Sequence, residues 1–526
     1  MFRSALHSTP IAGNIGDPKS GAGGRPREGE TADVIVIGGG GSGLSAAIEA
    51  RSLGRTVILV EKKERLGGTT GMSVGSISAS NTPHQIAAGI QDSPQHHFED
   101  MPLFAAKWMP RPDNEALRRL LTENVPDTVR WLMEMGVVFL GPNSEPPHRR
   151  PRMHNVLPTS ASYIYHLSRR ARRVGVDVRL STSAKEFIVE DGRVVGVVLK
   201  DDTGREFKVF ANGGVVLASG DFTASAELKA KYISPRIATV QAINPGSTGD
   251  GHKMAMPLGA KVLNGDVFPF YLRFIAPTRR KLIQMLPPWR AVTHTMNWAI
   301  RHLPEAILRP FLLDFLTTYL SPAPQMFADG AILVNSRGER FTQEAVDTSS
   351  ALVDQPGHTC FIIFDRALAL KYSRWPHFIS TAPGIGYAYF PDYKRSRKDI
   401  FYQANTAADL AAKLKLPVAT FEAALNRDSK NADGTLRTAA TSAPLYALGP
   451  VKILLTLADG GLDVTDRLQV KGHAGEPIPG LFAAGSVGQG GLLLEGHGHH
   501  LGWAFTSGRL AGRYAASQAV SRVNSL

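Results

Sequence analysis

The sequence is poor in the features of cross-linked, cluster-bearing or membrane-spanning proteins. Its single cysteine, Cys360, excludes internal disulfides, haem attachment through CxxCH and cysteine-ligated clusters. Cys360 lies in the apolar run CFIIF, which indicates a buried core thiol. No apolar run reaches the roughly 18 residues that a membrane-spanning helix needs. We therefore expect a protein of the cytoplasm, with peripheral membrane contact as the alternative.

Acidic residues are outnumbered: 46 Asp and Glu stand against 59 Lys and Arg, for a net charge of +13. No nucleic-acid-binding motif accompanies this charge, so solvated surface charge is the commoner explanation and no nucleic-acid partner is expected.

Residues 1–31 are rich in Gly, Pro, Ser and Arg and lack an apolar segment. We interpret them as a flexible leader rather than a secretion signal.

The most informative stretch that is present reads DVIVIGGGGSGLSAA and begins at Asp33. A strand of buried type is followed by Gly38, Gly40 and Gly43 and then by a helix, and a second apolar strand ends at Glu61. The first glycine permits a tight turn, the second lets the backbone approach a pyrophosphate, and the third lets helix and strand pack closely. Glu61 can accept a hydrogen bond from a ribose hydroxyl. This combination predicts a dinucleotide-binding βαβ unit.

The continuation after Glu61 favours FAD over NAD. The stretch LGGTTGMSVGSISAS forms a second turn rich in Gly, Thr and Ser, which adds backbone donors and hydroxyls beside one long, doubly phosphorylated ligand. At this point the chain resembles the FAD-dependent fumarate reductase/succinate dehydrogenase flavoprotein family, which includes the 3-oxosteroid 1-dehydrogenases. In that family this turn runs along the pyrophosphate and the flavin.

Two later segments extend the resemblance. GGVVLASGDF, which ends near Gly220, is similar to the family's ATGG-type segment, and GLFAAGSVGQGGLLLEGHGHHLGWAFTSGRLAG, from Gly480, is similar to its closing motif. The fold implied is α/β: a discontinuous Rossmann-like FAD-binding domain with an inserted α+β cap domain. We expect a leader at 1–31, FAD-binding parts at 32–260 and 447–526, and a cap at 261–446.

The predicted cofactor-binding residues come from all these segments. They are Gly38, Gly40, Gly41, Ser42, Gly43, Glu61, Lys62, Gly67, Gly68, Thr69, Thr70, Gly71, Ser73, Ala184, Ala218, Ser219, Gly220, Asp250, Gly485, Ser486, His500 and Leu501.

The reactive side chains of the family are changed here. In the family the flavin N5 exchanges hydride with a carbon, while a protein group moves the proton on the neighbouring carbon. Fumarate-reducing members use Arg and His clamps and a proton-delivering Arg; at the matching positions stand His500, Thr456 and a residue near Thr348. The C-terminal spacing is closest to the steroid dehydrogenases, yet their two catalytic tyrosines match Leu494 and again Thr348.

The candidate catalytic residues are therefore Glu495, His497, His499 and, in the cap, Tyr387. An imidazole titrates near neutral pH, so one histidine can move the proton while another holds an enolate oxygen. The alternative is that these histidines cap a helix or contact the flavin, the role expected for His500. Metal binding by the cluster is a third interpretation, which no matching carboxylate pattern supports, so no metal is expected. Tyr387 can donate to a ketone oxygen or simply pack in an aromatic hairpin with Tyr389.

These residues predict an FAD-dependent dehydrogenase that desaturates an apolar cyclic or steroid-like ketone, passing electrons to an external acceptor such as a quinone or redox protein. One alternative is the reverse reaction, an ene-reductase acting on an unsaturated acid or ketone. Another is a non-catalytic flavin-holding or membrane-associated subunit, and a weaker one is an NAD-binding regulator. The segment 267–324, with two Trp and many apolar residues, is expected to form cap helices or a membrane-contacting surface.

Overall fold

The described part of the chain covers most of the sequence. The computed structural model describes residues 28–523 apart from short gaps at 107–108, 110, 269, 276, 278–284, 305–306, 310–312, 314–315, 318–319, 343–347, 383–385, 427–428, 431–435 and 438–441. Almost all of the expected leader and parts of the segment 267–324 therefore lie outside the described residues.

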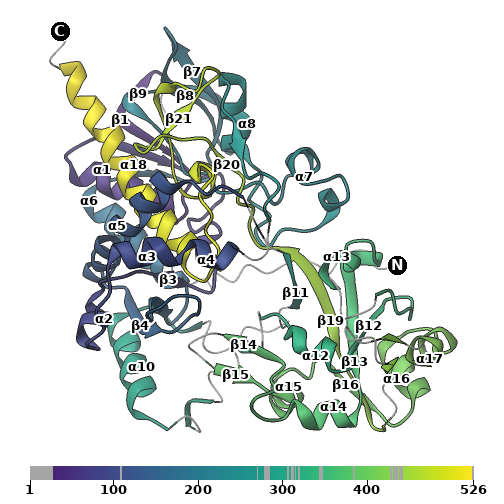
Figure 1. The fold of residues 1–526 in the computed structure, drawn as a ribbon. Helices are drawn as coiled ribbons and strands as arrows, with labels where there is room; N and C mark the ends of the chain where they lie inside the picture. The colour runs from purple at the N-terminus through teal and green to yellow at the C-terminus, as the bar shows by residue number, and fades with distance from the viewer. Residues whose placement is uncertain are drawn as a thin grey trace.

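The upper part of the molecule in Figure 1 is built on an eight-stranded sheet. Its main strand order is β21-β22-β9-β1-β2-β6, and β7 and β8 continue from β9. The bounds are β1 Glu30–Ile37, β2 Val57–Val60, β6 Asp177–Arg179, β7 Ser183–Glu190, β8 Arg193–Lys200, β9 Glu206–Leu217, β21 Gln469–Lys471 and β22 Pro477–Ala483. Strands β22, β9, β1, β2 and β6 are parallel, so their carboxyl ends share one edge, where parallel α/β sheets bind ligands.

Helices α1 (Gly41–Ser52) and α18 (His499–Val523) pack against each other beside this sheet. Glycines of α18 make the contact close: a Cβ at Gly508 would lie 2.3 Å from the carbonyl oxygen of Ser42, and one at Gly512 2.2 Å from that of Ala46. The C-terminal segment is therefore fixed against the first βα turn, as Figure 1 shows for the purple and yellow helices.

A three-stranded sheet of β3 (Ser76–Ser78), β5 (Met153–Leu157) and β4 (Val138–Asn143) lies beneath the large sheet. It contacts the closing motif just before α18, because the hydroxyl of Ser78 donates to the carbonyl oxygen of His497 at 2.7 Å. The amphipathic helix α10 (Arg290–His302) packs against β4 and β5.

The lower lobe is a five-stranded antiparallel sheet flanked by short helices (Figure 1). Its strands are β11 Phe270–Phe274, β12 Ile332–Asn335, β13 Thr359–Phe364, β16 Phe401–Ala404 and β19 Leu445–Leu455. The expected α+β cap is thus present as an insertion between parts of the doubly wound domain. The expected boundary at residue 446 falls inside β19, and the domain limits stay a prediction.

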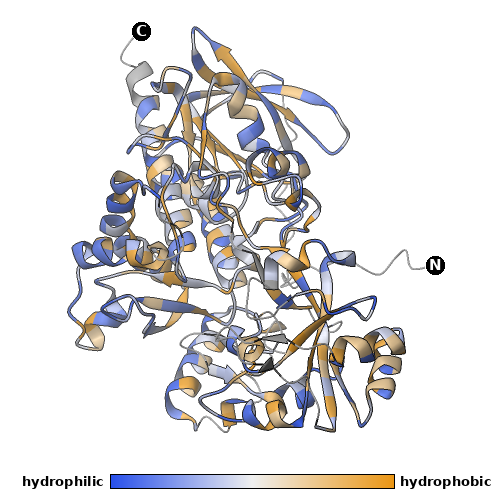
Figure 2. Cartoon of the chain, turned by 45° about the vertical axis from the view of Figure 1, so that its right-hand side comes forward, coloured by the Kyte–Doolittle hydropathy of each residue, from blue (hydrophilic) through white to orange (hydrophobic). Residues whose placement is uncertain are grey.

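Each lobe has its own hydrophobic core, and the strands of both are coloured mostly hydrophobic in Figure 2. Cys360 is fully buried in the cap sheet, and burial raises the pKa of its thiol, as expected of a core thiol. Within the described part of the chain, no helix combines the length and apolarity required to cross a membrane.

Candidate active site

The turn between β1 and α1 leaves open space for a phosphate beside Gly40. Gly40 is the N-cap of α1 and has no side chain that could cap the helix. Of the first-turn N–H groups, that of Gly41 donates to the hydroxyl of Thr70, and the end of the helix still offers its positive dipole to an anion. A Cβ on Gly40 would meet only the carbonyl oxygen of Gly67, at 4.0 Å. At Gly43, by contrast, a Cβ would lie 1.8 Å from the carbonyl oxygen of Gly38. Gly43 is therefore needed for close chain packing, and the space beside Gly40 is compatible with the ligand approach that the fingerprint predicts.

The carboxylate of Glu61 stabilises this turn through hydrogen bonds. One carboxylate oxygen accepts from the N–H of Gly39 at 2.8 Å and the other from the N–H of Lys63 at 2.9 Å. The hydroxyl of Thr70 accepts from the N–H of Gly41 at 3.1 Å, which ties the second glycine-rich turn to the first. A carboxylate accepts about four hydrogen bonds, so the predicted ribose contact of Glu61 is compatible with its present bonds.

Other predicted cofactor residues converge on the same turn from distant positions. Lys62 pairs with Asp250 at 2.6 Å, and Thr69 accepts from the side-chain amide of Asn244 at 2.9 Å. The N–H of Ala218 donates to the carbonyl of Ile37, at the end of β1. The hydroxyl of the next residue, Ser219, is buried with no hydrogen-bond partner.

Three more predicted cofactor residues, Gly485, Ser73 and Ala184, are linked to the glycine-rich turns or to Glu61. A Cβ at Gly485 would come within 2.7 Å of the hydroxyl of Ser42, and Ser73 donates to the carbonyl of Thr70. Ala184 lies on β7, two residues beyond Thr182, whose N–H donates to the carbonyl of Glu61. The open space at Gly40 and the orphaned hydroxyl of Ser219 both fit a long polar ligand such as FAD.

The start of α18 carries a part-buried ion pair that sequence reasoning missed. His500 Nε2–H donates to Asp459 Oδ1 at 2.9 Å, and the carboxylate of Asp459 is fully buried with its second oxygen unpartnered. Burial lowers the pKa of His500, but the charge and hydrogen bond of Asp459, helped by Glu495 and Asp221, outweigh it and raise this pKa. The imidazolium form is therefore more favoured in His500 than in a free histidine.

Glu495 belongs to the same cluster of charges. Burial and the negative charge of Asp459 raise the pKa of Glu495 to about 7, against the opposing effect of His500 and His497. Burial also raises the pKa of Asp221. His500 thus lies among three acidic groups, and Glu495 titrates close to neutral pH.

The other predicted catalytic residues have different surroundings. His497 is half-exposed, and its Nδ1 lies 2.5 Å from Glu145. His499 is fully buried and its Nε2 lies 3.2 Å from that of His97, whereas its neighbour His500 pairs with Asp459. Tyr387 lies on β15 (Gly386–Ala388) in the cap, 37% exposed. Its described contacts are with Trp375, Phe378 and Arg309, and none of them reaches the residues at the start of α18.

Sequence reasoning missed Asp459 and Glu145 for different reasons. Asp459 stands three residues after Thr456, which matches a clamp position of the family, and its acidic side chain could have been noticed as a partner for His500. Glu145 lies in an irregular loop with no motif around it. The catalytic assignments of individual residues stay predictions.

This geometry defines a flavoprotein oxidoreductase: a dinucleotide cradle at one edge of a doubly wound sheet, with an acid–base cluster brought to it by the C-terminal helix. The chain belongs to the family described as "FAD binding domain", whose model matches residues 33–281 and 322–493. The predicted cofactor, FAD, the predicted family and the prediction of an FAD-dependent oxidoreductase are thereby confirmed.

Two curated relatives illustrate the family. The chain is 27% identical over 507 residues to an NADH:fumarate oxidoreductase of Klebsiella pneumoniae (strain 342), covering 93% of this chain and 48% of that protein. It is 24% identical over 520 residues to a vinyl phenol reductase of Lactiplantibacillus plantarum, covering 92% of this chain and 96% of that protein. The chain thus spans about half the length of the first relative and nearly all of the second.

Solved structures show the same fold. The open conformation of a flavocytochrome c3 fumarate reductase superposes with a TM-score of 0.71 at 24% identity, covering 93% of this chain and 79% of that one. A 3-ketosteroid Δ1-dehydrogenase from Sterolibacterium denitrificans gives a TM-score of 0.64 at 19% identity, covering 93% and 100%. The predicted Rossmann-like domain with its inserted cap is confirmed by this likeness.

Proposed function

We propose that this protein transfers hydrogen at a carbon–carbon bond conjugated to a neutral carbonyl or aryl group, and that its main direction is reduction of the double bond. The observation that carries the proposal is the His500–Asp459 pair at the start of α18, in which Asp459 is fully buried, with Glu495 beside it. The reductases among the curated relatives support the reductive direction.

The charges of the site favour a neutral substrate. Three acidic groups, Asp459, Glu495 and Asp221, act electrostatically on His500, so a dicarboxylate bound there would meet like charges. The positions at which fumarate-reducing members of the family hold their clamps carry His500 and Thr456 in this chain. The hydroxyl of Thr456 is buried without a partner, three residues before Asp459, and is suited to donate to a carbonyl or phenol oxygen.

Proton transfer falls to His500. When bound, FAD supplies the site that gives or takes a hydride. His500, kept protonated by Asp459, donates a proton to the carbon next to the one that receives the hydride. Asp459 holds the imidazole in orientation and stabilises its charge, and the Thr456 hydroxyl stabilises the negative charge that develops on the conjugated oxygen. His500 then recovers its proton through Glu495 or solvent.

Desaturation of an apolar cyclic or steroid-like ketone remains a second candidate, because it is the same bond chemistry in the opposite direction. It needs a base instead of an acid, and Glu495, with a pKa of about 7, is about half deprotonated at neutral pH. The three leucines before it, Leu492, Leu493 and Leu494, are buried and give that side of the segment an apolar character.

A substrate panel tests both directions and the charge preference. Enzyme with chemically reduced FAD should be reoxidised anaerobically by neutral enones or vinyl phenols about 100-fold faster than by fumarate, because like charges cost a dianion several kcal/mol. Flavin absorbance at equal substrate concentration gives the rates. Equal or faster reoxidation by fumarate would contradict the neutral-substrate proposal. Bleaching of oxidised flavin by saturated ketones, with no reoxidation by enones, would instead favour the dehydrogenase.

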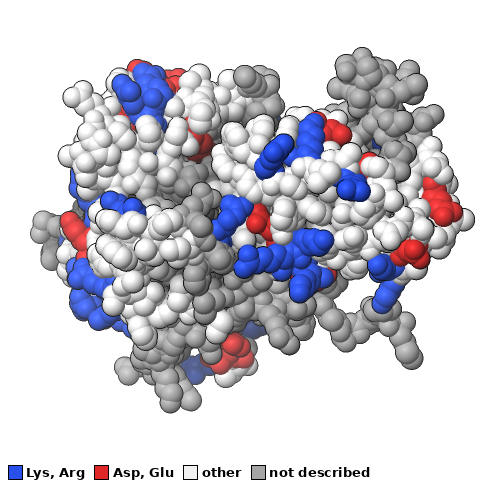
Figure 3. Space-filling model, turned by 90° about the horizontal axis from the view of Figure 1, so that it is seen from below, with Lys and Arg blue, Asp and Glu red and all other residues white. Residues whose placement is uncertain are grey.

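We propose that electrons for the reaction come from an external partner; the single cysteine leaves no CxxCH haem site in this sequence. We propose that this exchange takes place at an anionic membrane surface, with a quinone as partner. Helix α10 exposes Arg290, His294, Trp298 and Arg301, and Trp289 at its N-cap is 57% exposed. Residues 285–304 contain no Asp or Glu, and Lys and Arg gather across the face seen from below in Figure 3. Exposed Trp beside Arg suits the lipid headgroup region.

Liposome sedimentation tests this surface. Replacing Arg290 and Arg301 together with Gln should weaken binding to anionic vesicles about thirtyfold, at about 1 kcal/mol per charge. The double change Trp289→Ala and Trp298→Ala should weaken it further. Val189→Ser, at the opposite end of the molecule on β7 (Figure 1), is the control and should change nothing. Equal vesicle binding by all variants would remove α10 as the contact.

A further inference from the structure

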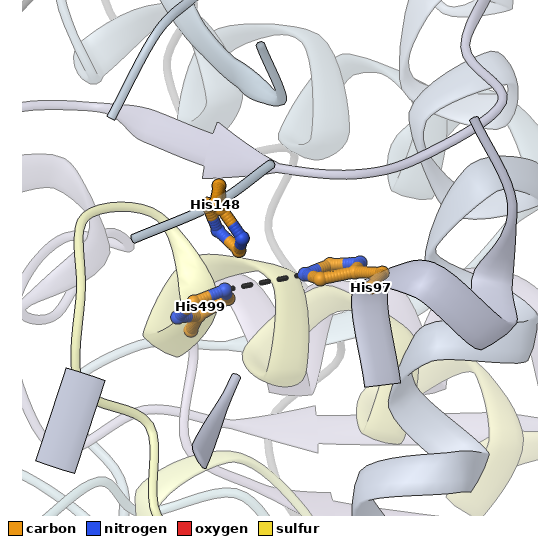
Figure 4. Close-up of side chains that lie close together, drawn as sticks. All are labelled: His97, His148 and His499. Atoms are coloured by element: carbon orange, nitrogen blue, oxygen red, sulfur yellow. Dashed lines mark hydrogen bonds between the residues drawn. The ribbon is translucent and has the colours of Figure 1, made fainter. Parts of the chain in front are cut away.

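Three histidines that are far apart in the sequence meet at one buried point. His97 lies in α3 (Pro94–Asp100), His148 in the loop between β4 and β5, and His499 is the first residue of α18. Their ring centroids are 5.4, 5.4 and 5.2 Å apart, nearly an equilateral triangle, and all three residues are buried. Figure 4 shows the ring of His148 pointing toward the line that joins the other two.

The nitrogens of these rings face one another. His97 Nε2 and His499 Nε2 are 3.2 Å apart, and each of the three residues offers one nitrogen within 4.8 Å of the others. His499 Nδ1–H donates to the carbonyl of Glu495, so the lone pair of its Nε2 points into the cluster. His148 Nε2 is buried with no hydrogen-bond partner. Such an orphaned nitrogen is costly unless something binds it.

The ring-centroid separations and the 3.2 Å between Nε2 of His97 and Nε2 of His499 match those of imidazoles on one tetrahedral metal ion, and the nitrogen of His148 lies within 4.8 Å of both. Zinc–nitrogen bonds of about 2.0–2.1 Å at tetrahedral angles place ligand nitrogens about 3.3–3.4 Å apart and ring centroids about 5 Å apart. Nitrogen ligation also requires neutral imidazoles. Burial lowers the pKa of His97 well below its usual value, that of His148 to about 2 and that of His499 to about 4.

We propose that His97, His148 and His499 bind one divalent transition-metal ion, with zinc the ion that best fits three neutral imidazoles. Phe104 covers one side of the cluster, with its ring centroid 4.7 Å from that of His148 and 5.5 Å from that of His499. The metal connects α3, the loop before β5 and the first turn of α18, whose next residue is His500. The metal ion positions the first turn of α18, and this role does not depend on which substrate the enzyme uses.

Metal binding requires a change around His148. Its Nδ1 now accepts from Arg152 Nη1 at 2.8 Å, which places the proton on Nε2. Ligation of the metal through Nε2 requires the proton to move to Nδ1. The Nδ1–H can then donate to Asp100 Oδ2, which lies 3.9 Å from Nδ1. Arg152 then keeps its two bonds to Asp92, each of 2.7 Å. The negative charges of Asp92 and Asp100 offset the positive charge of Arg152, which would otherwise repel the metal ion.

Cobalt titration of the full-length flavoenzyme, stripped with chelator and dialysed, is the direct test. Wild-type protein should bind one Co²⁺ or Zn²⁺ per chain, with the intense visible bands of tetrahedral cobalt in the difference spectrum, and metal should raise its melting temperature. His97→Ala and His148→Gln should each weaken the metal affinity at least about 100-fold, and Asp100→Asn about 10- to 100-fold.

The neighbouring His84–His154 pair provides the matched control. Its ring centroids are also 5.4 Å apart, but it has only two histidines, so His84→Ala should leave metal binding unchanged. The wild-type titration needs no variant, and its failure to show stoichiometric binding would overturn the proposal. Retention of full affinity in both folded histidine variants, as judged by circular dichroism, would overturn it as well.

Discussion

Replacing Asp459 with Asn should lower kcat/KM for the accepted substrate about 10²- to 10³-fold and leave FAD binding unchanged. Asp459 is the buried partner of His500 and keeps the imidazole charged and oriented. The amide has nearly the same size and can still accept a hydrogen bond, but it carries no charge. General acid catalysis contributes about 10²- to 10⁴-fold to a rate, so the loss of a correctly protonated acid removes most of that factor.

The pH dependence separates this role from a merely structural one. In the wild type the pKa of His500 is raised, so the protonated acid persists to higher pH and reductive activity falls as pH rises through that raised pKa. In Asp459→Asn the pKa of His500 drops, and the same fall in activity should occur at lower pH. Glu495, whose pKa is about 7, adds a second titration that Glu495→Gln should remove.

Steady-state rates across pH 5–9 give the measurement. Asp463→Asn serves as the control, because Asp463 lies four residues later and pairs with Lys471 at 3.0 Å, away from His500. A wild-type rate in Asp459→Asn, or a reduced rate with an unshifted pH profile, would contradict proton donation by His500.

The cradle for FAD could be predicted from the sequence because its signal is local. One βαβ unit contains all four residues of the fingerprint, Gly38, Gly40, Gly43 and Glu61. The spacing of these residues alone identifies the role expected of each. The large sheet followed for the same reason, since near-continuous apolar runs such as Val34 to Ile37 predict strands buried on both faces.

The reactive side chains could not be predicted equally well, because they depend on contacts between distant irregular segments. His500 meets Asp459 across a separation of 41 residues, and His497 meets Glu145 across 352. The histidine cluster joins positions 97, 148 and 499, and only the last lay in a recognisable motif. Hydrogen bonds of this kind leave no periodic pattern in a single sequence. His497, His499 and His500, three histidines within four positions, therefore looked like one site although they face three different partners.

Exchanging single glycines for alanine should separate FAD binding from folding. Gly40→Ala should fold like the wild type and bind FAD at least about 100-fold more weakly, because the added methyl group occupies the space through which the backbone approaches the pyrophosphate. Without ligand that methyl group meets only the carbonyl oxygen of Gly67 at 4.0 Å, and φ of −81° at Gly40 suits alanine.

Gly43→Ala should behave in the opposite way, because its Cβ would lie 1.8 Å from the carbonyl oxygen of Gly38. Forcing apart β1 and α1 should cost about 3 kcal/mol or more of unfolding free energy, the upper end of the range for overpacking. Urea unfolding of both apoproteins and FAD titration by flavin fluorescence give the two quantities. The variants control each other, since they make the same chemical change three residues apart. Wild-type FAD affinity in Gly40→Ala would show that the pyrophosphate does not lie beside Gly40, and the proposed geometry of the site would fall with it.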